Sequence, residues 1–107
     1  MSKKLQWSKE APKRMTWNEA QEYAKNLRED GYDDWGLPTL AELTIALANQ
    51  FIKYGPKEPL GFRDGYIYWS GLEGDADGAW GAYGGSGGYV NTFNGFKDYQ
   101  FAVRCAR

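Results

Sequence analysis

The chain has 107 residues with 13 basic and 14 acidic side chains, and 17% of its residues are aromatic. This length predicts one domain over residues 1–107, and the net charge of −1 excludes binding through a general attraction to phosphate. The absence of histidine excludes His-based catalytic or metal sites, and the single cysteine excludes an internal disulfide and a Cys-rich zinc site. We therefore expect no cofactor and, because no apolar run reaches membrane-spanning length, no membrane insertion.

The first predicted helix covers about residues 17–29. Thr16 and Glu19 mark its start, because they have the spacing of a capping box. Gly31 is the expected stop, since glycine tolerates the left-handed conformation that often ends a helix. Apolar residues between them recur at steps of three and four, which places them on one helix face: Trp17, Ala20, Ala24 and Leu27.

A second predicted helix covers about residues 40–52. Thr39 and Glu42 repeat the capping-box spacing, and Gly55-Pro56 is the expected stop. Its apolar stripe consists of Leu40, Leu43, Leu47 and Phe51.

Glycine and aromatic residues dominate the chain beyond about residue 60, which indicates short strands and turns. The expected strands are 66–70, 79–83, 88–93 and 99–105, and residues 5–7 form a further strand. Chain ends often lie close together, so we expect this first strand to pair with the last one. Helices followed by strands predict an α+β fold.

Alternation along two of these strands assigns their faces. Tyr89, Asn91 and Phe93 share one face of the 88–93 strand, and Val90 and Thr92 share the other. The last strand has an apolar face and a more polar one: Tyr99, Phe101, Val103 and Cys105 on the first, and Gln100, Ala102 and Arg104 on the second.

Cys105 is the one candidate nucleophile or redox centre. Activation of a thiol needs a cationic neighbour, a helix N-terminus or a base. Arg104 points to the opposite face of the strand from Cys105, and the chain has no histidine to act as base. A buried structural cysteine is therefore the favoured interpretation.

Three further motifs have a chemical and a structural interpretation. Residues 73–78 begin like a calcium loop, but the glutamate expected at its twelfth position is missing, so an acidic turn is favoured. Residues 84–88 precede a predicted strand rather than a helix, which favours a hairpin tip over a phosphate-binding loop. Asp33 and Asp34 lack the cleft that paired catalytic acids require, and a surface turn is expected there.

The stretch from residue 80 to residue 99 is the strongest functional candidate. Large aromatic side chains alternate there with glycine and asparagine, which is the composition of a binding surface. The alternative is that these aromatic residues build the core of a small sheet. Residues 61–101 hold more acidic than basic side chains, which disfavours nucleic-acid binding. The predicted ligand-binding residues are Trp80, Tyr83, Tyr89, Asn91, Asn94, Phe96, Lys97, Asp98 and Tyr99.

An ordered set of motifs over about residues 15–107 resembles a known family. The chain is similar to the C-terminal domain of bacterial collagen-like adhesins, the Lcl-type domain. More broadly, it resembles the C-type lectin fold shared with formylglycine-generating enzymes and with the variable proteins of diversity-generating retroelements. The resemblance rests on Trp17-Asn18-Glu19-Ala20, Gly31 to Thr39, Glu42-Leu43, Tyr68-Trp69-Ser70-Gly71, Ala79-Trp80, Gly88-Tyr89-Val90-Asn91 and Val103-Arg104-Cys105-Ala106-Arg107.

The resemblance implies two helices packed on a small twisted antiparallel sheet with paired termini. It also implies adhesion to glycans, as in Lcl-type domains, or display of changeable residues on the late strands, as in retroelement variable proteins. Either role would use the segment from Trp80 to Tyr99. Matching positions implied to be structural are Trp35, Leu37, Pro38, Trp69 and Arg104.

The chain departs from the family pattern at two places. Family members often carry a cysteine in the first helix, where this chain reads Tyr23-Ala24-Lys25, and an arginine where it has Gly36. Cys105 thus lacks its usual partner, which points to a reducing, cytoplasmic or phage-associated setting, whereas the resemblance points to the cell surface. The acidic 61–101 segment also disfavours attraction of sulfated glycans by charge alone.

These observations favour a non-enzymatic module that presents residues 80–99 to a protein or glycan ligand. The alternative is a structural domain whose aromatic surface binds its own copies, giving a homo-oligomer. An enzyme built around Cys105 is the third hypothesis.

Overall fold

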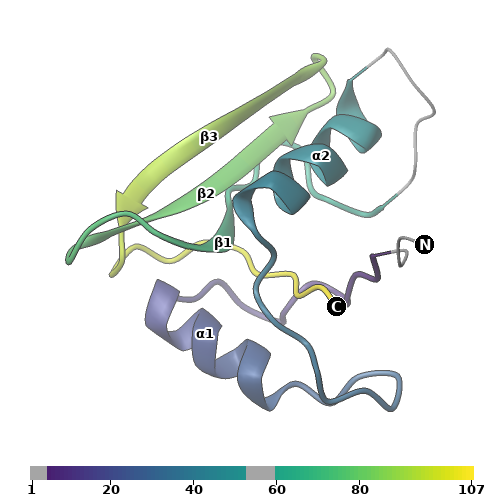
Figure 1. Cartoon of the computed structure of the whole chain (residues 1–107). Coiled ribbons are helices and arrows are strands. Elements are labelled where there is room, and N and C mark those ends of the chain that lie inside the picture. The colour runs from purple at the N-terminus through teal and green to yellow at the C-terminus, as the bar shows by residue number, and fades with distance from the viewer. Residues whose placement is uncertain (1–4, 53–59) are drawn as a thin grey trace.

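The structure, a computed structural model, has two helices followed by a three-stranded antiparallel sheet (Figure 1). It describes residues 5–52 and 60–107. This arrangement confirms the predicted α+β class. The elements in chain order are α1 (Trp17–Asn26), α2 (Leu40–Phe51), β1 (Tyr68–Glu73), β2 (Gly78–Gly85) and β3 (Tyr89–Phe96).

Both helices begin where the sequence predicts. Thr16 accepts a hydrogen bond from the backbone N–H of Glu19, whose carboxylate accepts one from the N–H of Thr16. Thr39 and Glu42 make the same reciprocal pair at the start of α2. Each capping box satisfies backbone donors that have no partner within the helix.

The predicted end of the first helix is wrong. The helix ends at Asn26, because Leu27 is extended, with ψ 131°. The guanidinium of Arg28 donates to the carbonyls of Lys25 and Leu27, which provides a local end to the helix. Gly31 does have a positive φ, but it belongs to a separate turn after the helix.

The second helix ends at Phe51, close to the predicted residue 52, with an extended Ile52 as its cap. The expected stop at Gly55-Pro56 lies outside the described residues.

The sheet has the order β1-β2-β3, so β3 is an edge strand. The pairing of β2 with β3 is continuous from Gly78 opposite Phe96 to Gly85 opposite Tyr89. The pairing of β1 with β2 is irregular between Trp69 and Glu73. All three strands overlap their predictions, and each extends further toward the C-terminus than predicted.

The last predicted strand is an extended segment joined by isolated bridges rather than a regular strand. Phe101 bridges Met15, Ala102 bridges Tyr68, and Ala106 bridges Trp7. The predicted pairing of the two chain ends is confirmed, and the two end segments run side by side in Figure 1. The segment is irregular because its bridging partners change along its length.

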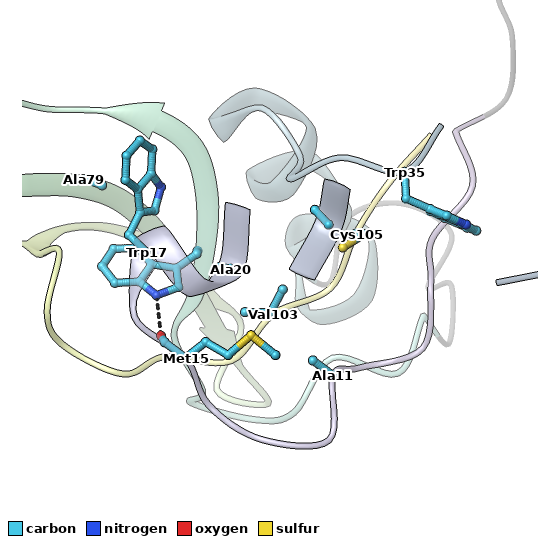
Figure 2. Close-up of a cluster of buried hydrophobic side chains, with 10 residues drawn as sticks. Ala11, Met15, Trp17, Ala20, Trp35, Ala79, Val103 and Cys105 are labelled. Atoms are coloured by element: carbon cyan, nitrogen blue, oxygen red, sulfur yellow. Dashed lines mark hydrogen bonds between the residues drawn. The ribbon is translucent and has the colours of Figure 1, made fainter. Parts of the chain in front are cut away.

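Two buried clusters occupy opposite faces of the sheet. One contains α1 residues together with Trp69 and Ala79 (Figure 2), and the other contains α2 residues together with Tyr68 and Ala82. Adjacent strand residues point to opposite faces, so Tyr68 and Trp69 enter different clusters. In Figure 2 the dashed line is the hydrogen bond from the Trp69 indole to the Met15 carbonyl.

The expected polar face of the last segment is buried, which corrects that prediction. Ala102 lies in the α2 cluster, and Arg104 is 9% exposed. Arg104 donates to the carbonyls of Ser8 and Leu60, and its guanidinium lies 4.7 Å from the centre of the Phe62 ring. Burial lowers the pKa of Arg104, and backbone carbonyls accept its hydrogen bonds.

Replacement of Gly81 tests the close approach of β2 to β1. A Cβ there would lie 2.5 Å from the Tyr68 carbonyl oxygen, so Gly81→Ala forces the strands apart. We expect a loss of about 1–3 kcal/mol in the free energy of unfolding, measured by urea denaturation. Gly87→Ala, where the new atom makes only ordinary contacts, is the matched control and should change stability by less than about 0.5 kcal/mol. Equal effects of the two changes would contradict this packing.

Candidate functional site

The β2–β3 hairpin has one face against α2. Cross-strand partners share a face, so Ala82 lies with Thr92, and Gly84 with Val90. Ala82 and Val90 pack in the cluster that α2 contributes to, and a Cβ on Gly84 would lie 3.0 Å from Phe51 of that helix. This face of the hairpin is therefore part of the core.

The opposite face of the hairpin carries Tyr83, Tyr89, Asn91 and Phe93, and we call it the open face. Tyr89 is 39% exposed and Asn91 is exposed, while Tyr83 and Phe93 are half-buried. Helix α1 packs against β1 and shares a buried cluster with the hairpin only at Ala79. Ala79 lies near the start of β2, at the end of the hairpin away from its tip. The open face thus presents aromatic rings and an amide to solvent.

Two glycines hold the open-face rings close to the backbone. A Cβ on Gly85 would lie 2.5 Å from the Tyr89 hydroxyl, and one on Gly95 would lie 2.6 Å from the Phe93 ring. The two rings therefore lie over positions that have no side chain. Tyr83 packs edge-on against Tyr89, and Phe101 packs edge-on against Phe93, so this surface offers both ring faces and ring edges to a ligand.

The open face continues into a group of aromatic rings from the last part of β3 and the segment that follows it. The ring centres of Phe93 and Phe101 are 5.6 Å apart, those of Phe101 and Tyr99 5.9 Å, and those of Tyr99 and Phe96 5.4 Å. Tyr99 is 45% exposed and Phe96 is 58% exposed. Exposed aromatic side chains therefore lie at both ends of β3, with Tyr89 near the hairpin tip and Phe96 and Tyr99 near this turn.

An open groove of about 760 Å³, which we call the turn groove, adjoins Phe96 and Tyr99. It lies between the start of α1, the loop before β2 and the turn after β3. Its lining residues are Thr16, Asn18, Ala76, Asp77, Phe96, Lys97, Asp98 and Tyr99.

Lys97 is held by the fold. Its backbone N–H donates to Asp77 and its carbonyl accepts from Trp17. Its ammonium pairs with Glu73, donates to the Ala76 carbonyl and lies 5.0 Å from the centre of the Trp17 ring. Lys97 therefore fixes the wall of the turn groove, and its side chain is only 15% exposed.

The structure divides the predicted ligand-binding residues into three sets. Tyr83, Tyr89 and Asn91 lie on the open face, and Phe96, Lys97, Asp98 and Tyr99 line the turn groove. Trp80 and Asn94 are cross-strand partners on the α2-facing side, so Trp80 does not share a surface with the open-face residues. Asn94, however, lines a second groove together with Phe93, Phe96 and Tyr99.

Sequence reasoning omitted several residues that adjoin this surface. Phe93 follows the same alternation as Tyr89 and Asn91, so the pattern could have identified it. Thr16, Asn18 and Asp77 come from distant parts of the chain, and no local pattern places them beside Tyr99.

The acidic segment 73–78 forms a turn. The Asp75 carboxylate accepts hydrogen bonds from the N–H groups of Asp77 and Gly78, at 2.9 and 2.7 Å. Within residues 5–52 and 60–107, no group of three or more acidic or cysteine side chains could hold a metal ion.

The other two motifs also have structural roles. The hairpin tip predicted at residues 84–88 is confirmed for residues 86–88, whereas Gly84 and Gly85 belong to β2. Asp64 accepts hydrogen bonds from the N–H and hydroxyl of Ser86. These bonds lower the pKa of Asp64. Asp34 forms a two-point ion pair with Arg107, which joins this surface turn to the chain end.

Cys105 is buried, as predicted. Burial raises the pKa of its thiol from 9.0 to about 12, so the protonated form dominates at neutral pH. Its backbone N–H donates to the hydroxyl of Ser8.

A comparison with family models matches residues 1–107 to the Lcl C-terminal domain. A search of curated proteins finds no match. Among the described residues, neither helix combines the length and the apolar character needed to span a membrane.

Thiol labelling tests the environment of Cys105. A pKa of about 12 instead of 9.0 lowers the thiolate fraction about a thousandfold near pH 8. We expect a neutral disulfide reagent to react at least that much more slowly with the native protein than with the urea-unfolded chain. Asn91→Cys adds an exposed thiol as a positive control for the native protein. Rapid labelling of native wild-type protein would contradict a closed, protonated Cys105.

Proposed function

We propose that the chain, which belongs to the Lcl C-terminal domain family, is a non-enzymatic ligand-binding domain. Its membership of this family supports an adhesin-like role. Its target is a protein or a glycan, bound at the open face of the β2–β3 hairpin and the adjoining turn. The observation that carries this proposal is the exposure of three large aromatic side chains, Tyr89 on the open face and Phe96 and Tyr99 at the turn groove.

The roles of the side chains follow from their exposure. Tyr89 and Tyr99 act as anchors, because large rigid rings contribute much contact area at little cost in conformational entropy. Asn91, placed between them on the open face, donates and accepts directional hydrogen bonds. Half-buried Tyr83 and Phe93 support the exposed rings from the side.

Charge contributes little to the proposed binding. Lys97, the basic residue of the turn groove, is already paired with Glu73 and packed on Trp17, and Asp77 and Asp98 add acidic groups to the same wall. A polyanion would therefore be bound weakly here. The favoured ligands are neutral sugar rings or apolar protein surfaces, which stack on aromatic side chains.

Two observations support the non-enzymatic part of the proposal. The thiol of Cys105 is buried and protonated, so it is not available as a nucleophile. Asp34, one of the paired acids considered above, is bound to Arg107 at the surface.

We also propose that the scaffold is C-type-lectin-like and related to retroelement variable proteins. The paired chain ends and the two helices that flank a small antiparallel sheet support the first part. Exposed aromatic residues on the late strands support the second. A reverse-transcriptase gene beside a near-copy of the last coding segment would bear out the retroelement relation.

Alanine substitutions at the two anchors test the proposal. Against an immobilised panel of neutral glycans, sulfated glycans and extracellular proteins, Tyr89→Ala and Tyr99→Ala should each weaken binding about tenfold or more. Both should leave the melting temperature nearly unchanged, because the rings are exposed. Ile45→Ala, which removes a 61% exposed apolar side chain from α2, is the matched control and should bind normally.

Gly85→Ala adds a subtler variant, because the added methyl group displaces the Tyr89 ring without removing it, together with the Asp64 carboxylate, which lies equally close. It should weaken the same interactions as Tyr89→Ala. Binding that survives both tyrosine changes, or that falls steeply with salt, would contradict an aromatic, charge-independent site.

A further inference from the structure

The outer edge of β3 is an unusual feature for a soluble domain. Edge strands normally carry charges, prolines or bulges that prevent pairing with another chain. The eight residues of β3, Tyr89–Phe96, include no charged residue and no proline, and their pairing with β2 is uninterrupted. Strand β3 itself therefore has no charge, proline or bulge that would prevent strand addition.

The hydrogen-bond pattern of β2 identifies which backbone groups of β3 face outward. The carbonyls of Gly78, Trp80 and Gly84 accept hydrogen bonds from residues on the side away from β3. The backbone N–H and C=O groups of even-numbered β2 residues thus point away from β3, and those of odd-numbered residues bond to β3. The N–H of Lys97 continues this pattern, because it donates to the carbonyl of Asp77, an odd-numbered residue.

The outward-facing residues of β3 are accordingly the even-numbered ones, Val90, Thr92, Asn94 and Phe96. Of their outward backbone groups, only the Phe96 carbonyl has a partner in the described part of the chain, the N–H of Tyr99. The remaining groups form a regular row of donors and acceptors that matches the backbone of an extended strand.

We propose that this edge pairs with β3 of a second copy of the chain, antiparallel across a two-fold axis at Phe93. In this register Val90 faces the partner's Phe96 and Thr92 faces the partner's Asn94. This register places every outward-facing residue of one strand opposite one of the other, and a shift of two residues in either direction leaves some of them unpaired. The Phe96 carbonyl, which already accepts from Tyr99, uses its second lone pair for the partner strand. The proposal does not depend on the identity of the ligand.

The side chains suit a partner of the same sequence. Phe93 meets the partner's Phe93 in a non-hydrogen-bonded pair, where side chains approach most closely. Val90 meets the partner's Phe96, a residue that is 58% exposed in the single chain. Because β3 carries no charge, the pairing brings no like charges together, and the net charge of −1 gives little repulsion between copies.

The two-fold axis runs perpendicular to the sheet, so both open faces lie on the same side of a six-stranded sheet. The aromatic surface of one copy then continues into that of its partner. A short edge contact is small for a protein interface, so we expect a concentration-dependent dimer rather than a permanent one.

Proline at Thr92 tests the pairing directly. Thr92 faces outward, so Thr92→Pro removes a donor from the outer edge and leaves the β2–β3 ladder intact. We expect it to raise the dimer dissociation constant about tenfold or more in sedimentation equilibrium, with an unchanged circular-dichroism melt. Thr92→Ala keeps the N–H and should dimerise like wild type. Wild-type protein that stays monomeric at about 1 mM, or a dimer that Thr92→Pro leaves intact, would overturn the proposal.

Cross-linking tests the register and does not rely on the proline variant. Phe93→Cys places two thiols at the two-fold axis, so mild oxidation should give a disulfide-linked dimer. Asn91→Cys is the matched control. In the dimer the two cysteines at position 91 would be offset along the strands by four residues, or about 13 Å, so they should not cross-link. Cys105 is buried and does not compete. Equal cross-linking of both variants, or none with Phe93→Cys, would overturn this register. Loss of the dimer with ligand binding retained would leave the proposed function standing.

Discussion

The fold depends on the C-terminal segment, which lies between the N-terminal segment and β1. The N–H groups of Ser8 and Ala11 donate to the carbonyls of Cys105 and Val103, and Trp69 of β1 donates to Ala102 on the other side. Alternate side chains of the segment enter opposite clusters, Ala102 with α2, and Val103 and Cys105 with α1. The last residues of the chain thus join both cores, although chain ends are commonly poorly ordered.

This central segment explains why one face of the hairpin is open. The cluster around α1 is built on Trp69, Val103 and Cys105, so it covers the sheet near the chain ends. It reaches the hairpin at Ala79 and, through Phe101, at Phe93. Helix α2 packs against all three strands from the other face. The hairpin therefore extends beyond α1, where Tyr89 and Asn91 are exposed and Tyr83 and Phe93 are half-buried.

Local patterns identified much of the fold and part of the site. The helix starts depend on capping boxes within four residues, and the faces of β3 follow from alternation; both were predicted correctly. The separation of Trp80 from Tyr83 follows from the same alternation along β2, but the choice of the face that α2 covers is non-local. Burial of Arg104 likewise depends on Phe62, far away in the sequence. The turn groove combines α1 with late loops, and no local pattern indicates that contact.

Amide hydrogen exchange measured by NMR tests the central place of the C-terminal segment most directly. The N–H groups of Ala102 and Cys105 donate to the Ile67 carbonyl and the Ser8 hydroxyl between two cores. We predict that both amides exchange only through global unfolding, with the same exchange free energy as the buried amides of α2, Leu43 and Leu47. Exchange of Ala102 and Cys105 through local opening, while Leu43 and Leu47 stay protected, would contradict this account.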